Sequence, residues 1–159
     1  FEYGIIDSIM KTDGNGGQYL YMPGGGSLNP STKSTLNKRL HYVKQDGASV
    51  FKRAVKGMTT VTLEIMKRNR LNAENIDLFI PHQANKRIIE SVGNKIGFKE
   101  NQLLINIDKY ANTTAATIPI AMHDALSDNK LKKNDSLIIS TFGAGFTWGS
   151  IYMKWDING

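Results

Sequence analysis

Three junctions in this sequence, where an apolar run gives way to polar or small residues, contain side chains suited to chemistry. His82 follows the apolar run 78–80, and Asn112 lies thirty positions further on. The small residues Gly143, Ala144 and Gly145 follow another apolar run near the end of the chain. An imidazole N–H and an amide NH₂ can both donate hydrogen bonds to one oxygen and stabilise it as it gains negative charge. These residue types therefore suit enolate chemistry.

Each junction also has a simpler interpretation. A lone histidine is more often a structural residue than a catalyst, and Asn112 is a good N-cap for the helix expected after it. Residues 143–145 precede an expected strand and lack a following Lys-Ser or Lys-Thr pair, which argues against a nucleotide-binding loop. Their small size instead allows a backbone N–H to approach a ligand as an oxyanion donor. The carboxyl ends of neighbouring parallel strands share one sheet edge, which favours a single site.

The elements that must position these residues alternate between strand and helix patterns. Strands are expected at 3–12, 18–22, 78–80, 103–107, 136–141 and 146–155, the first two as a hairpin. Helices are expected at 46–69, 85–97 and 112–128. Residues 23–38 show neither period, so the segment 23–45 is expected to be a loop or flap. This order predicts an α/β fold: a mostly parallel five-stranded sheet with helices packed on it and an antiparallel C-terminal hairpin.

Composition narrows the functional class. With 159 residues, 40% of them hydrophobic and 21% charged, the chain has the size and balance of one globular domain. No run of 18 apolar residues occurs, so no membrane span is expected. The net charge of +6 is compatible with an anionic partner, but the basic helices lack the interleaved aromatic residues of a nucleic-acid surface. Cysteine is absent, which excludes a cysteine nucleophile within this chain, and no spacing suggests a metal site.

Three motifs resemble one known family. They are P-H-Q-A-N at 81–85, A-N-T-T-A-A-T-I-P at 111–119 and F-G-A-G-F-T-W-G at 142–149. Together they resemble the C-terminal half of β-ketoacyl-acyl-carrier-protein synthase III, a thiolase-fold condensing enzyme, and the similarity extends from Gly4 to Trp155. The resemblance implies that residues 1–159 are the C-terminal thiolase-like domain, and that the N-terminal half with its nucleophilic cysteine is absent. A first residue of Phe1 instead of Met agrees with a chain that begins inside a larger protein.

The resemblance implies a decarboxylative Claisen condensation of acyl-CoA with malonyl-carrier protein, which starts fatty-acid synthesis. In that family, residues matching His82 and Asn112 bind the malonyl thioester oxygen as CO₂ leaves, and Ala144 N–H would be an oxyanion donor. Contacts to the acidic carrier protein and coenzyme A would come from Lys52, Gln83, Arg87 and Lys95. No cofactor, metal, nucleic acid or membrane is implied. The resemblance also implies a cytoplasmic protein that pairs with its own N-terminal half and forms a homodimer when full-length.

Two alternatives stay open. One is a related thiolase-fold acyltransferase, such as a polyketide starter synthase or a hydroxymethylglutaryl-CoA synthase. The other is a non-catalytic module whose basic helices dock an acidic carrier protein, with His82 and Asn112 structural. Charge reversal at the basic positions distinguishes enzyme from module, because in the enzyme it weakens carrier-protein binding much more than cysteine acylation. Without the missing cysteine, the chain alone is expected to be inactive in condensation.

Overall fold

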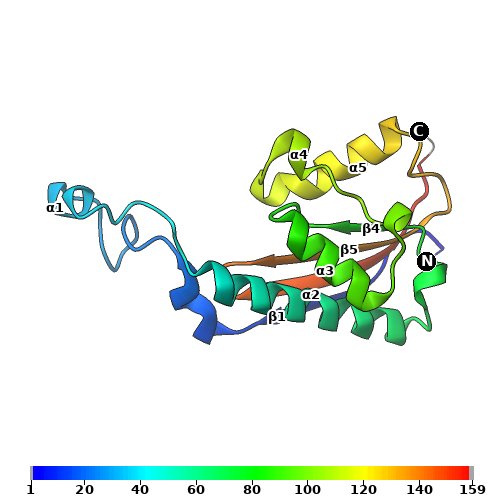
Figure 1. The fold of residues 1–159 in the computed structure, drawn as a ribbon, viewed down its shortest axis with the longest axis horizontal. Helices are drawn as coiled ribbons and strands as arrows, with labels where there is room; N and C mark the ends of the chain where they lie inside the picture. Colours follow the sequence, from blue (N-terminus) through cyan, green and yellow to red (C-terminus); the bar gives the residue numbers. More distant parts are fainter. Residues whose placement is uncertain (1, 158–159) are drawn as a thin grey trace.

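A four-stranded sheet with helices on both faces forms the body of the protein (Figure 1). This computed structural model describes residues 2–157. The strands of the sheet are β1 (Gly4–Thr12), β4 (Leu78–Pro81), β5 (Ser136–Gly143) and β6 (Thr147–Lys154), arranged in the order β1-β6-β5-β4. β4 and β5 run parallel, whereas β6 is antiparallel to both of its neighbours. The α/β class and the C-terminal hairpin are therefore confirmed.

The predicted number and direction of the strands were wrong. Of the strand expected at 103–107, only Leu103 forms a bridge, parallel to Phe79, and a short helix begins at Ile107. The pairing stops because the backbone N–H of Asn106 donates to the side-chain Oε1 of Gln83, 3.0 Å away, and not to a neighbouring strand. In the part of the chain that the structure describes, the sheet thus has four strands, of which only β4 and β5 form a parallel pair.

The expected hairpin between 3–12 and 18–22 was also wrong. Gly14–Tyr19 forms a 3-10 helix, and β2 (Leu20–Tyr21) pairs with β3 (Lys44–Gln45) in a separate sheet. Asp13 explains the difference, because its Oδ1 accepts the N–H of Asn15 and starts the 3-10 turn. The backbone of Asp13 also pairs in both directions with Phe146, at 2.8 and 2.7 Å, which extends the pairing of β1 with β6.

The helices agree closely with the sequence pattern at two of the three predicted positions. They are α1 (Lys33–Asn37), α2 (Gly47–Arg68), α3 (Lys86–Ile96), α4 (Ile107–Tyr110) and α5 (Thr117–Ser127). α2 begins after Asp46, which accepts the N–H of Ser49, and α3 ends at Gly97 with a φ of 91°. α5 begins later than the expected Asn112, because positive φ angles at Ala111 and Thr114 keep residues 111–114 out of a continuous helix.

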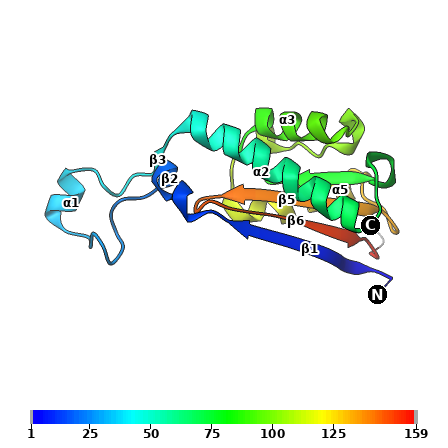
Figure 2. The same cartoon turned by 90° about the horizontal axis from the view of Figure 1, so that it is seen from below.

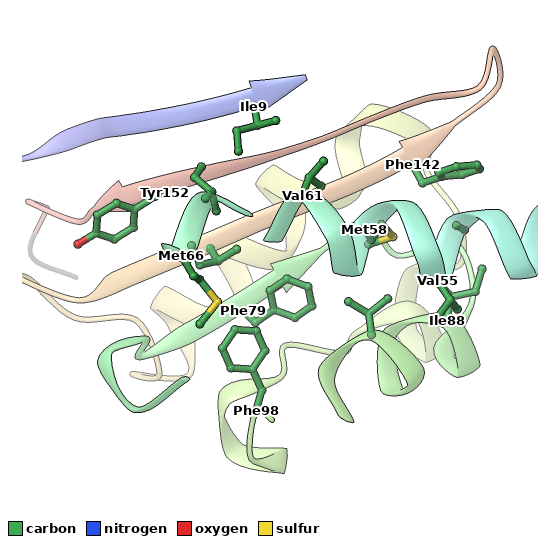
Figure 3. Packing of buried hydrophobic residues seen from close by; sticks show 14 of the residues in the cluster. Ile9, Val55, Met58, Val61, Met66, Phe79, Ile88, Phe98, Phe142 and Tyr152 are labelled. Carbon is green, nitrogen blue, oxygen red and sulfur yellow. The ribbon is translucent and has the colours of Figure 1, made fainter. Parts of the chain in front are cut away.

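Alternate residues of the strands pack on opposite faces of the sheet. Phe79 and Ile138 belong to a cluster with α2 and α3, which lie along the same side in Figure 2, whereas Ile80 and Ile139 pack with α5. Figure 3 shows the first cluster, in which the rings of Phe79 and Phe98 have centroids 5.1 Å apart. Complete burial of one such side chain contributes roughly 1.5–3 kcal/mol. Core packing on both faces therefore fixes the carboxyl ends of β4 and β5.

The segment expected to be a flap extends away from the body in both views (Figures 1 and 2). It contains α1, whose N-cap Thr32 forms a reciprocal capping box with Thr35. The pairing of β2 with β3 closes its base. Its apolar residues have few neighbours, since Leu28 is 91% and Leu36 60% exposed. Local capping and a short strand pair thus order this segment without a core of its own.

Candidate functional site

A cavity of about 870 Å³ brings the three sequence junctions together. His82, Asn112, Gly143 and Ala144 all contribute to its lining. The remaining walls come mainly from α2, α3 and the β2–β3 pair: Leu20, Tyr21, Val50, Phe51, Ala54, Met58 and Ile88. The expectation of a single site therefore agrees with this cavity, although Asn112 reaches it from the turn after α4 and not from the end of a strand.

His82 follows the carboxyl end of β4 and lies at this cavity. The backbone N–H of His82 donates to the carbonyl of Ser140 on β5 at 2.9 Å, which extends the parallel pairing by one residue. The carbonyl of His82 then accepts the N–H of Ala84 at 3.0 Å, so the chain turns directly into α3. Both backbone groups of His82 are thus engaged, and this leaves its imidazole as the group available for chemistry.

The imidazole of His82 is partly buried and makes one hydrogen bond within residues 2–157. Its Nδ1 lies 2.6 Å from the hydroxyl oxygen of Thr117, the first residue of α5. Burial lowers the pKa of His82 below its ordinary value, because the cavity wall disfavours the charged form. The ring is therefore neutral near pH 7, with one protonated nitrogen that donates and one that accepts.

Asn112 is not the N-cap of α5, which begins at Thr117, but its side-chain oxygen holds the preceding turn while its amide nitrogen stays available. Its Oδ1 accepts the backbone N–H of Thr114 at 2.9 Å. Within the described part of the chain, the Nδ2 group makes no hydrogen bond, and the residue is exposed to the cavity. A carboxamide whose oxygen is occupied presents its NH₂ to a ligand. Structural and chemical roles are therefore compatible in this residue.

The turn between β5 and β6 forms the third side of the site. Gly145 has a φ of +140°, and a Cβ there would lie 2.7 Å from the hydroxyl of Thr147, so the position requires glycine. A Cβ on Gly143, by contrast, would meet nothing within 4 Å. Ala144 is exposed and does not have a positive φ, so its methyl group is tolerated. Gly145 shapes the turn without lining the cavity, whereas Gly143 and Ala144 line it.

The predicted CoA and carrier-protein contacts are not all brought together. Arg87 lines the cavity, with its guanidinium carbon 5.6 Å from the centroid of the Phe51 ring. Lys52 and Lys95 are exposed but do not line it. Arg87 is thus the predicted basic residue that the geometry places beside the proposed donors.

Gln83 is 1% exposed, which does not suit the predicted role as a binding contact. Its Nε2 donates to the carbonyls of Pro81 and Leu104 at 2.8 and 3.1 Å, and its Oε1 accepts the N–H of Asn106. All these partners are backbone groups, so the side chain joins the turn after β4 to the segment before α4. Its geometry is that of a structural clamp.

Sequence reasoning missed Thr117 and the apolar wall of the cavity. The helical spacing of Phe51, Ala54 and Met58 indicated that they face the core. These residues, in the N-terminal half of α2, also line the cavity. Thr117 lies five residues after Asn112, inside the helix expected at 112–128, and no role was predicted for its hydroxyl. A hydroxyl at the first turn of a helix that follows a candidate site was the available signal.

Other kinds of site have little support in the described residues. Within residues 2–157, no three His, Asp or Glu side chains are grouped so that they could hold a metal ion. The same part of the chain contains no helix with the length and apolar character needed to cross a membrane.

Comparison with known proteins gives consistent matches. The family described as 3-oxoacyl-[acyl-carrier-protein] synthase III, C terminal, matches residues 66–155, more than half of the chain. A β-ketoacyl-[acyl-carrier-protein] synthase III of Koribacter versatilis is 49% identical over 97% of this chain, which covers 46% of that protein.

Solved structures agree with this match. A 3-oxoacyl-[acyl-carrier-protein] synthase III from Aquifex aeolicus aligns with a TM-score of 0.83 at 30% identity, over 98% of this chain and 46% of its own. The corresponding enzyme from Thermus thermophilus aligns with a TM-score of 0.83 at 33% identity, over 96% of this chain and 46% of its own. The resemblance and the thiolase-like fold are confirmed, and the chain spans about half the length of the curated relatives it matches.

Proposed function

Because the chain belongs to the family of 3-oxoacyl-[acyl-carrier-protein] synthase III C-terminal regions, we propose that it supplies the malonyl-activating side of a condensing active site. The complete protein joins an acyl-CoA primer to malonyl-carrier protein with loss of CO₂. The observation that supports this function best is the single cavity lined by His82, Asn112 and Ala144. An attacking carbon generated there must react with an acyl group held by a residue outside this chain, which contains no cysteine.

The proposed chemistry begins with the malonyl thioester oxygen between His82 and Asn112. As CO₂ leaves, the electrons of the breaking C–C bond move toward the thioester carbonyl and form an enolate, whose oxygen becomes negative. A neutral imidazole N–H and the Nδ2 group stabilise this oxygen, and removal of one such donor raises the barrier by about 3 kcal/mol. The enolate carbon then attacks the acyl thioester, and the Ala144 N–H donates to the oxyanion that this step creates.

The cavity walls suit a long thioester carrier. α2 and α3 contribute apolar side chains, which can pack against a flexible arm without competing for its hydrogen bonds. Arg87 supplies a guanidinium on the same lining, and a guanidinium pairs well with phosphate oxygens. The proposal therefore places the phosphate end of coenzyme A or phosphopantetheine toward Arg87.

The partners of the complete protein form part of the same proposal. Its relatives are named for the acyl-carrier protein, and a net charge of +6 favours an acidic protein partner. The chain is proposed to pair with its own N-terminal half, and the full-length protein to form a cytoplasmic homodimer. No cofactor is proposed, because two neutral donors and a thioester are sufficient for the decarboxylation described.

The decisive experiment uses the full-length protein with His82→Ala. Decarboxylation of a malonyl thioester, measured as CO₂ release, is expected to fall about 100-fold or more because one oxyanion donor is lost. Acylation of the cysteine by acyl-CoA, followed by mass spectrometry of the intact protein, is expected to stay within about twofold. His123→Ala is the matched control, since His123 is exposed on α5 and does not line the cavity. A folded His82→Ala protein that still releases CO₂ at the original rate contradicts the proposed function.

A further inference from the structure

Thr117 makes two contacts that compete for one proton. Its Oγ1 lies 2.6 Å from Nδ1 of His82 and 2.9 Å from the carbonyl oxygen of Thr114. The side chain is almost completely buried, with 2% of the residue exposed. A hydroxyl has a single proton, so it donates to only one of these two groups at a time. The direction of this donation decides where the imidazole of His82 carries its own proton.

The carbonyl of Thr114 does not need the hydroxyl as a donor. It already accepts the backbone N–H of Thr117, which closes the 3-10 turn at Thr114–Ala116 just before α5. Nδ1 of His82 has no other hydrogen-bond partner within residues 2–157, and its contact with Oγ1 is the shorter of the two. Both observations favour donation from the hydroxyl to Nδ1.

We propose that Thr117 is a positioning residue that holds His82 in the tautomer with its proton on Nε2. With Nδ1 accepting from the hydroxyl, Nε2–H is free to donate to the thioester oxygen. In the opposite tautomer, Nε2 presents a lone pair to an oxygen that gains negative charge, and the stabilisation is lost. This inference rests on the proposed function, because it assigns a cause to the donor role of His82.

The same short segment also positions the second donor. The N–H of Thr114 donates to Oδ1 of Asn112, while the carbonyl of Thr114 accepts from Thr117. Thr114 therefore links the two residues: its N–H binds the side chain of Asn112, and its carbonyl binds the N–H of Thr117. The tautomer of His82 and the orientation of the Asn112 amide therefore depend on one local structure.

The test compares Thr117→Val, Thr117→Ser and the unmodified full-length protein. Valine has nearly the same shape as threonine without the hydroxyl, and serine keeps the hydroxyl. In ¹⁵N spectra of histidine-labelled protein, the unmodified protein and Thr117→Ser are expected to show His82 protonated at Nε2, and Thr117→Val to lose this preference. We expect malonyl decarboxylation to fall about 10- to 100-fold in Thr117→Val, the loss typical of an orienting hydrogen bond, and to stay within about threefold in Thr117→Ser.

Thr113→Val is the matched control. Thr113 lies in the same turn, and its buried hydroxyl has no hydrogen-bond partner among the described residues, so this change should leave the tautomer of His82 unaltered. An unmodified protein with the His82 proton on Nδ1, or a Thr117→Val protein with unchanged tautomer and rate, overturns the inference. If Thr117→Val does not fold, the spectra of the unmodified protein and of Thr117→Ser still decide.

Failure of this inference can be told from failure of the proposed function. If His82→Ala retains decarboxylation, the proposed function is wrong whatever the tautomer. If His82→Ala abolishes decarboxylation while Thr117→Val matches the unmodified protein in rate and tautomer, only the role of Thr117 is wrong.

Discussion

The two proposed donors in the cavity, His82 and Asn112, and the predicted basic contact residues are positioned in different ways. His82 follows the buried strand β4 and Asn112 lies in the turn after α4, and each is held by hydrogen bonds. Lys52 and Lys95 share only positive charge and exposure, and neither lines the cavity. Arg87 is intermediate, since it is exposed but lines the cavity beside the ring of Phe51. Hydrogen bonds thus fix the positions of the two donors, for which a displacement of about 1 Å would slow the reaction.

This difference predicts different sizes of effect. A donor fixed by its neighbours acts on one oxygen, and one such hydrogen bond contributes several kcal/mol to a barrier. An exposed cation acts through solvent and salt, and one exposed ion pair contributes about 0.2–1 kcal/mol. Substitutions of His82 or Asn112 should therefore change rates, and those of exposed basic residues should change binding moderately.

The largest effect is expected for Asn112→Asp in the full-length protein. A carboxylate can still accept the N–H of Thr114, so the turn and the thermal stability should be preserved. The NH₂ donor is replaced by a negative oxygen, and decarboxylation should fall about 100-fold or more. CO₂ release from malonyl thioester measures this loss, and Asn129→Asp in an exposed turn is the control. A loss of less than about threefold would show that the Asn112 amide only stabilises its own turn.

An intermediate effect, on stability, is expected for Gln83→Leu. The change leaves the buried groups that the amide now satisfies, the carbonyls of Pro81 and Leu104 and the N–H of Asn106, without this partner. The free energy of unfolding should fall by about 2–3 kcal/mol. Denaturant unfolding measures this loss, with the exposed Gln18→Leu as control. Weaker carrier-protein binding at unchanged stability would return Gln83 to the set of binding residues.

The smallest effects are expected for charge reversal of the basic residues. Arg87→Glu should weaken carrier-protein binding about tenfold, and Lys52→Glu or Lys95→Glu about threefold, because only Arg87 lines the cavity. Calorimetric titration at two salt concentrations measures the effect, which should shrink as salt increases. Lys67→Glu makes the same change of net charge at the far end of α2. Equal losses in all four variants would indicate a general charge effect and no ordered site.

The sequence predicted the parts of this site that depend on chain direction. His82 was found because a short apolar strand runs directly into it, and residues 143–145 because small residues follow a strand. Thr117 and Gln83 were beyond such reasoning, since their roles depend on partners distant in sequence: His82 for one and Asn106 for the other. The type of a residue and its position along the chain do not show which way its side chain points.

The fold was predictable to a similar degree. Helix ends at Asp46 and Gly97 follow from local capping, and so could be predicted well. The pairing of β1 could not, because its partner β6 lies more than a hundred residues away and a nearby apolar segment offered a false alternative. Local sequence patterns predict where strands form, but contacts between distant segments determine which strands pair.

The central place of β6 also affects the order in which the protein can be assembled. Within residues 2–157, β1 is bonded to the rest of its sheet only through β6, so it cannot pair before Thr147–Lys154 has been synthesised. On the ribosome, the early residues therefore leave the exit tunnel long before their partner is synthesised. Contacts between such distant segments slow folding and leave unpaired strand edges exposed. We expect the edge of β1 to stay unpaired in the nascent chain until β6 emerges.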